Sequence, residues 1–147
     1  MMTSRQFQKL CHRHGLAATY QREIIYQTAM SQKGHPSPEA LFVRVRKKIP
    51  SISLATVYAN LHTFIAKGLL SEVSVHHGPL RVETNQQPHH HLVCLRCRSI
   101  ADFDDAGVIS SGLRRRLPSR FQLQRVVVDV LGICEACSRK RRATSKK

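Results

Sequence analysis

Apolar residues recur at helical spacing through the first half of the chain, which predicts a series of amphipathic helices. Phe7 and Cys11 would lie on the apolar face of a first helix that ends at Gly15. A second helix would begin after the capping residue Thr19 and end near Gly34. For Cys11 we expect only a small, half-buried side chain, because free cysteine packs as a small hydrophobe.

Two further helices have clear boundary signals. Ser37 can cap a third helix with Pro38 at its first position, where a missing N–H costs nothing. Ser53 can cap a fourth helix that ends at Gly68. The outer face of this fourth helix holds only small, hydrogen-bonding or basic residues: Thr56, Ala59, Asn60, Thr63 and Lys67. A solvated face would usually carry Glu and Lys pairs, so this face is typical of a helix that enters the major groove of DNA.

Residues 69–85 predict two strands around a His-Gly-Pro turn, which would expose His76 and His77. Helices followed by a β-hairpin are typical of a winged helix-turn-helix, in which the hairpin is the wing. The polar residues 84–88 are the expected hinge to a second domain.

After the hinge the pattern changes, and we expect a strand, a helix and a strand over residues 89–103, 104–120 and 121–134. So small a unit suits a dimerisation module held together by zinc. The expected fold class is therefore α+β. It comprises a winged-helix DNA-binding domain, a small α/β dimerisation and metal-binding domain, and a disordered basic tail: residues 1–84, 85–137 and 138–147.

The net charge of the chain limits the kinds of partner that it can bind. The formal net charge is +15, and the last ten residues carry six basic residues and no acid. Such a chain is attracted to polyanions, of which nucleic acid is the first candidate. No segment approaches the roughly 20 apolar residues of a membrane span, and the N-terminus lacks the apolar core of a signal peptide. We therefore expect a cytoplasmic protein with no membrane partner.

Four cysteines occur as two CxxC pairs, Cys94 with Cys97 and Cys134 with Cys137. Thiols stay reduced in the cytoplasm, so such pairs indicate zinc rather than disulfides. Four thiolates complete a closed structural zinc site. Any nearby histidine is then left for a second metal.

The three histidines before the first CxxC pair alternate along a predicted strand. His89 and His91 would share one face, whereas His90 would point the other way. The pair can be extended by a histidine before the third helix, an acid at the end of the hairpin and an acid after the CxxC strand. The complete set is His35, Glu83, His89, His91 and Asp102. Imidazoles and carboxylates in this ratio suit Fe(II), Mn(II) or Zn(II), and such a site would join both domains as a metal-dependent switch.

Two other classes of protein fit parts of this pattern. A hydrolytic zinc enzyme could use Glu83 as its base, but catalytic zinc usually keeps only three protein ligands, and five would crowd the ion. A zinc-containing RNA-binding protein would need an aromatic stacking surface, whereas aromatic residues make up 5% of the chain and tryptophan is absent. Recognition of duplex DNA, without enzymatic activity, is the favoured interpretation.

The motifs in this chain resemble those of the ferric uptake regulator (Fur) family, in the family's order and spacing, from about Gln8 to Cys137. They are HPSPEALF, ISLATVYANL, KGLL, HHHLVCLRCRSIADF and GICEAC. The resemblance implies a homodimeric, metal-dependent transcriptional regulator that binds a palindromic DNA operator. It also implies structural Zn²⁺ at Cys94, Cys97, Cys134 and Cys137, and regulatory Fe²⁺ or Mn²⁺ at the five-residue site.

Residues for DNA contact come from both lines of reasoning. Tyr58 matches the family's base-contacting tyrosine, and Arg22 matches a basic residue that the family places near the DNA. Thr56 and Asn60 lie on the predicted outer face of the fourth helix. Arg13 is a further candidate because it is basic and stands between two histidines.

Within the family, the chain most resembles the peroxide-sensing PerR branch. Its last acidic ligand is Asp102, as in PerR, where iron regulators usually have Glu. The iron regulators' additional site also lacks its counterparts, because Val126 and Ile109 stand at those positions. The PerR resemblance implies that iron-bound peroxide chemistry oxidises His35 and His89. Glu83 is instead like Fur, so an iron-uptake regulator without peroxide sensing is the alternative.

Overall fold

The computed structural model describes residues 2–73, 79–85, 87, 89–104, 108–124 and 126–144. The chain divides into two compact units, Met1–Gln86 and Gln87–Lys147. Within the described ranges, no helix combines the length and the apolar character that a membrane span requires.

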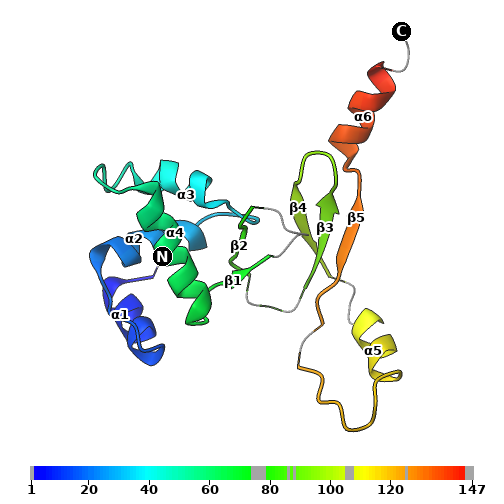
Figure 1. Cartoon of the computed structure of the whole chain (residues 1–147), viewed down its shortest axis with the longest axis horizontal. Coiled ribbons are helices and arrows are strands. Elements are labelled where there is room, and N and C mark those ends of the chain that lie inside the picture. The colour runs from blue at the N-terminus through cyan, green and yellow to red at the C-terminus, as the bar shows by residue number, and fades with distance from the viewer. Residues whose placement is uncertain are drawn as a thin grey trace. The chain divides into compact units, whose positions relative to one another are not determined.

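The first unit contains the expected helices, each preceded by a capping side chain. They are α1 (Ser4–Arg13), α2 (Tyr20–Met30), α3 (Pro38–Val45) and α4 (Leu54–Ala66) (Figure 1). Thr19, Ser37 and Ser53 each accept a hydrogen bond from the backbone N–H three residues later, which confirms these predicted caps. Gly68, with φ of 70°, takes the left-handed conformation that ends α4.

The core of the first unit forms around three aromatic rings in contact, one from each of three helices. The ring of Tyr26 on α2 lies 5.5 Å from that of Phe7 on α1 and 5.7 Å from that of Phe64 on α4. Cys11 is fully buried beside them rather than half-buried as predicted. This core fixes α4 on its apolar side, through Val57, Leu61 and Phe64, and leaves its other face at the surface.

A short antiparallel sheet completes the first unit. Strand β1 (Ser71–Glu72) pairs with β2 (Val82–Glu83), with Ser71 opposite Glu83. The predicted turn with His76 and His77 lies outside the described residues. The N–H of Val82 donates to the carbonyl of Pro36 at 3.1 Å, so β2 holds the loop that precedes α3.

The second unit contains a sheet of strand order β4-β3-β5. Strand β3 (His90–Cys94) pairs antiparallel with β4 (Ile100–Phe103) and parallel with β5 (Asp129–Gly132) (Figure 1). The prediction of one strand over 89–103 is wrong, because the chain turns back at the first CxxC pair, where Arg98 has φ of 59°. The predicted strand 121–134 is also too long, since among its described residues only Asp129–Gly132 form a strand.

The described residues of the second unit include two helices. Helix α5 (Val108–Arg114) occupies the middle of the predicted helix 104–120, of which 105–107 lie outside the described residues. Helix α6 (Glu135–Thr144) runs into the segment that we expected to be a disordered tail. That prediction is wrong for residues 138–144, whereas 145–147 are not described. Arg, Lys and Ala favour helix, and Glu135 pairs with Arg139 one turn later.

Candidate functional site

The four cysteines of the CxxC pairs come together within the second unit. Cys94 ends β3 and Cys97 lies in the following turn, whereas Cys134 follows β5 and Cys137 stands in the first turn of α6. Parallel pairing sets Cys94 opposite Gly132, and this register carries the second CxxC pair to the first.

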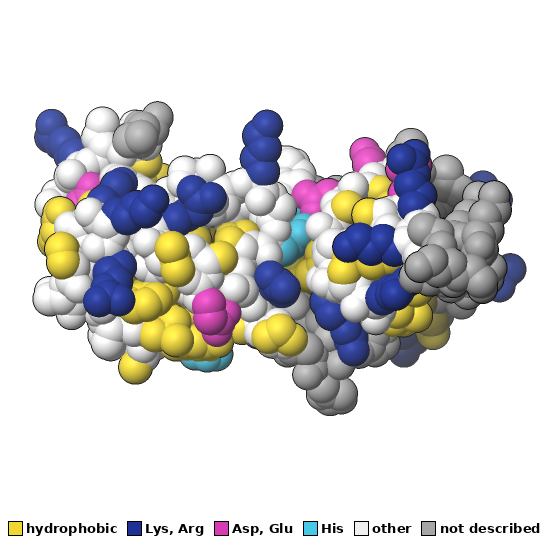
Figure 2. Space-filling view, turned by 90° about the horizontal axis from the view of Figure 1, so that it is seen from above, with side chains coloured by type: hydrophobic (Ala, Val, Ile, Leu, Met, Phe, Trp, Pro, Cys, Tyr) yellow, Lys and Arg dark blue, Asp and Glu magenta, His cyan; other side chains and the backbone are white. Residues whose placement is uncertain are grey.

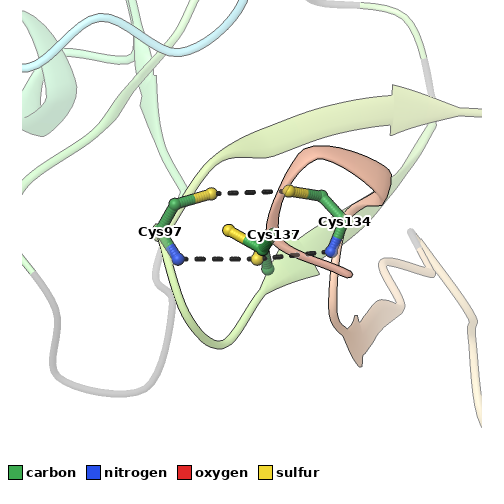
Figure 3. Close-up of side chains that lie close together, drawn as sticks. Cys97, Cys134 and Cys137 are labelled. Carbon is green, nitrogen blue, oxygen red and sulfur yellow. Dashed lines mark hydrogen bonds between the residues drawn. The ribbon is translucent and has the colours of Figure 1, made fainter. Parts of the chain in front are cut away.

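The spacing of the sulfur atoms suits one tetrahedral ion. All four Sγ atoms lie within 4.8 Å of one another. Figure 3 shows Cys97 and Cys134 facing each other, with their sulfurs 3.6 Å apart. Zinc–sulfur bonds of about 2.3 Å give a tetrahedron with edges of about 3.8 Å. The donor set and its dimensions therefore fit a structural zinc ion.

The surroundings shift the pKa values of the cysteine thiols in different directions. Backbone N–H groups of Cys134 and Cys97 donate to the sulfur of Cys94, which lowers the pKa of that thiol to about 6. The hydroxyl of Ser99 lowers the pKa of Cys97, while burial raises that of Cys137 to about 12. Because a buried thiolate needs a neighbouring cation, this cluster would ionise fully only around a metal.

His89 and His91 form the centre of a second cluster, also in the second unit. Their rings meet edge to face with centroids 4.8 Å apart, and their Nε2 atoms lie 3.1 Å from each other. His90 lies on the opposite face, where its Nδ1 accepts from the Val128 N–H and its ring contacts Phe103. The alternation predicted for the three histidines is therefore correct.

The other ring nitrogens decide what these two histidines can bind. His89 Nδ1 lies 2.6 Å from the carbonyl oxygen of Gln87, and His91 Nδ1 lies 3.1 Å from Oδ1 of Asp129. Both partners are acceptors, so each Nδ1 carries a hydrogen and Nε2 is the ring nitrogen that can bind a metal. Bonds of about 2.1 Å at a right angle would separate the nitrogens by about 3.0 Å.

A carboxylate completes this cluster, and another supports it. Oδ1 of Asp102 on β4 lies 3.9 Å from Nε2 of His89. Sequence reasoning missed Asp129, which orients His91 from β5. It is 38 residues away in the chain, and only the parallel register, in which His91 stands opposite Asp129, brings the two together. Such outer carboxylates fix the tautomer of a ligand histidine.

The first unit holds the other two predicted regulatory ligands as a pair. Nε2 of His35 lies 2.9 Å from Oε2 of Glu83, and both side chains are buried. The Asn85 N–H donates to the other carboxylate oxygen of Glu83. Contact between the Pro36 loop and β2 brings this pair together. Each unit thus carries its own share of imidazole and carboxylate ligands.

The predicted DNA-contacting residues gather mainly on α4 and its neighbour α2. The Nε of Arg22 donates to Oδ1 of Asn60, whose Nδ2 donates to the Thr56 carbonyl. Thr56 also joins the cap at Ser53. Arg22 and Asn60 therefore hold each other at the surface of the helix pair. Arg13 ends α1 and is exposed, and among the described residues it makes no hydrogen bond to this group.

The face in Figure 2 carries more basic than acidic side chains, as the composition requires. Helix α4 itself has no acidic residue. Both features suit an approach to phosphates.

Comparison with known proteins identifies one family. The sequence profile of the ferric uptake regulator family matches residues 13–130. The chain belongs to the ferric uptake regulator family. Members of this family are metal-responsive transcriptional regulators that bind DNA as dimers, not enzymes, which excludes the hydrolase interpretation.

The relatives that this chain matches include a peroxide regulator and ferric uptake regulators. The peroxide operon regulator of Bacillus subtilis is 28% identical over 126 residues, 86% of this chain and 87% of its own. The ferric uptake regulation protein of Campylobacter upsaliensis is 26% identical over 138 residues, 92% and 88% of the two chains. The solved ferric uptake regulator of Vibrio cholerae is 27% identical with a TM-score of 0.74, covering 87% of this chain and 99% of its own.

Proposed function

We propose that this chain is a cytoplasmic, homodimeric repressor that binds a palindromic operator when a divalent metal occupies its regulatory site. Zinc would bind the four cysteines, and Fe(II) or Mn(II) would bind a site shared by both units. The regulatory ligands are His35, Glu83, His89, His91 and Asp102. The observation that carries the proposal is the approach of Nε2 of His89 to Nε2 of His91, 3.1 Å apart, which is the spacing expected of two ligands of one divalent ion.

The division of the ligands between the units supplies the switch. His35 and Glu83 belong to the first unit, and the remaining three ligands belong to the second. An ion bound by both sets would fix one unit against the other and select one arrangement of the two recognition helices in a dimer. Without the ion, that arrangement loses its stabilisation, and affinity for an operator with fixed half-site spacing falls.

An exposed apolar row on the sheet supports the homodimer. Leu92 on β3 stands opposite Ala101 on β4 and Val130 on β5. All three are exposed, Leu92 by 45% and Val130 by 44%. Apolar side chains in one continuous row on a sheet face suit burial against a second copy of the same face.

Peroxide is the proposed signal. Asp102 stands at the position where the family's peroxide sensors have Asp, and Val126 and Ile109 remove the additional site of the iron regulators. In the net reaction, hydrogen peroxide transfers one oxygen atom to a ring carbon of His35 or His89, and the other oxygen leaves as water. Fe(II) held by these ligands would act as a catalyst for opening the O–O bond, while the histidine ring provides the two electrons of the net reaction. The oxidised ring no longer presents its original ligand geometry, and the metal is lost.

The test uses the zinc-containing dimer loaded with Fe(II), with Mn(II)-loaded protein as its control. Stoichiometric hydrogen peroxide is added, peptide masses are mapped, and binding to an operator duplex selected by the untreated protein is measured. We expect one added oxygen on His35 or His89 in the iron form alone, together with loss of operator binding. Unoxidised histidines with full binding would instead favour an iron-uptake regulator, as Glu83 suggests.

Asp129 offers an independent test of the regulatory site. Asp129→Asn removes the carboxylate that holds His91 by its Nδ1, so the ring is free to turn and to change tautomer. We expect Mn(II) affinity to fall by about 10- to 100-fold, measured by titration calorimetry on the zinc-loaded protein. Asp104→Asn, a nearby exposed acid, is the control. Equal Mn(II) affinity in Asp129→Asn and wild type would argue against His91 as a ligand.

A further inference from the structure

Tyr58 on α4 has its hydroxyl bound by an acid from another helix. The Tyr58 O–H donates to Oε1 of Glu39 at 2.5 Å. Glu39 lies in the first turn of α3, which is capped by Ser37. Helix α4 contains no acid of its own, so Glu39 is a carboxylate brought to its surface from outside.

Neighbouring groups favour Tyr58 as the donor and Glu39 as the acceptor of this hydrogen bond. The bond from Tyr58 holds the pKa of Glu39 below its usual value, and Arg81 beside β2 acts in the same sense. The same contact raises the pKa of the Tyr58 phenol. Glu39 therefore stays an ionised acceptor and Tyr58 stays a protonated donor. The phenol ring also lies against His62, with centroids 6.3 Å apart and planes 28° apart.

A phenol has one hydrogen to donate and lone pairs that accept. Since Glu39 takes the hydrogen, the Tyr58 oxygen can offer only lone pairs to a further partner. In the major groove, the amino groups of adenine N6 and cytosine N4 are donors, whereas guanine O6 and N7 and thymine O4 are acceptors. An acceptor-only phenol distinguishes these two classes of base edge.

We propose that Glu39 is a specificity-determining residue, which makes Tyr58 select bases that present an amino group, adenine or cytosine, on the strand it contacts. The inference rests on the proposed function, in which α4 reads duplex DNA. It concerns the hydroxyl oxygen of Tyr58 at that interface. Removing the Glu39 carboxylate releases the phenol hydrogen, and Tyr58 can then donate to guanine or thymine.

The test is a selection from random DNA duplexes by the full-length, zinc- and Mn(II)-loaded protein. Tyr58→Phe identifies the operator position that depends on the hydroxyl, because its base preference disappears there. At that position we expect wild type to enrich adenine or cytosine. Glu39→Ala should shift the preference by about fivefold or more towards guanine or thymine. Glu72→Ala, which removes an exposed acid on β1, should retain the wild-type motif.

The amide variant guards against a folding defect in Glu39→Ala. Glu39→Gln keeps the size of the side chain, but its amide can either accept from Tyr58 or donate to it, so the preference should relax to both classes of base. A wild-type motif retained in both Glu39 variants would overturn the inference while leaving the proposed function intact. If wild type selects no motif at all, the proposed function fails and the inference fails with it.

Discussion

Cys97→Ser is expected to unfold the second unit while the first unit stays folded. The sheet β4-β3-β5 has strands of only four or five residues. Among the described residues of this unit, the buried apolar side chains are few: Val93, Cys94 and Cys137. So small a core cannot offset the conformational entropy of the ordered chain, and zinc has to supply the difference.

The size of this effect follows from the metal. Structural zinc contributes an apparent free energy of about 10–16 kcal/mol in small zinc-dependent folds near neutral pH. Loss of one thiolate opens the closed site and removes much of that free energy. The first unit has its own aromatic core and no share in the cysteine cluster, so its helices should persist.

Zinc content and hydrogen exchange measure the result. We expect Cys97→Ser to lose zinc and the protection of β3 and β5 amides, with α2 and α4 still protected. Cys11→Ala is the matched control, because it removes a cysteine outside the cluster and should keep zinc. Protected β3 amides in zinc-free Cys97→Ser would contradict the view that zinc holds this sheet together.

The second large effect is expected when proposed metal ligands in different units are replaced. Glu83→Ala and His89→Ala should each abolish the gain in operator affinity that Mn(II) produces. Typical coupling between two sites is about 5- to 150-fold, and that factor should fall to about one. The two residues lie in separate compact units, so equal losses follow only if both hold the same ion.

Fluorescence anisotropy with and without Mn(II) gives this factor directly at fixed salt, since phosphate contacts make affinity depend on ionic strength. The control is His12→Ala, an exposed histidine on α1. Full metal response in Glu83→Ala, with zinc still bound, would mean that the ion is held by the second unit alone. The switch would then need another cause.

Elements set by local chemistry were predictable from the sequence. Thr19, Ser37 and Ser53 cap their helices because each side chain reaches an N–H only three residues away. Alternation along a strand likewise predicted that His89 and His91 share one face, because the two residues are near neighbours in the chain. These signals involve neighbours in the chain and do not depend on the tertiary fold.

Features that depend on distant pairing were missed or misjudged. The turn inside the first CxxC pair separates β3 from β4, yet no Gly, Pro or Asn in the run from His89 to Phe103 marks it. The contact between His91 and Asp129, like that between Tyr58 and Glu39, exists only after separate elements have packed. Such contacts leave no periodic pattern in the sequence from which they could be predicted.

The parallel pairing of β3 with β5 has a consequence for the order of folding. The first unit is built largely of local helical contacts, which form quickly and become available early in synthesis. Strand β3 must wait for β5, and Cys94 and Cys97 must wait for Cys134 and Cys137. On the ribosome, a DNA-reading unit can therefore be folded before its zinc site exists, and the supply of zinc decides when the newly made chain gains its second unit.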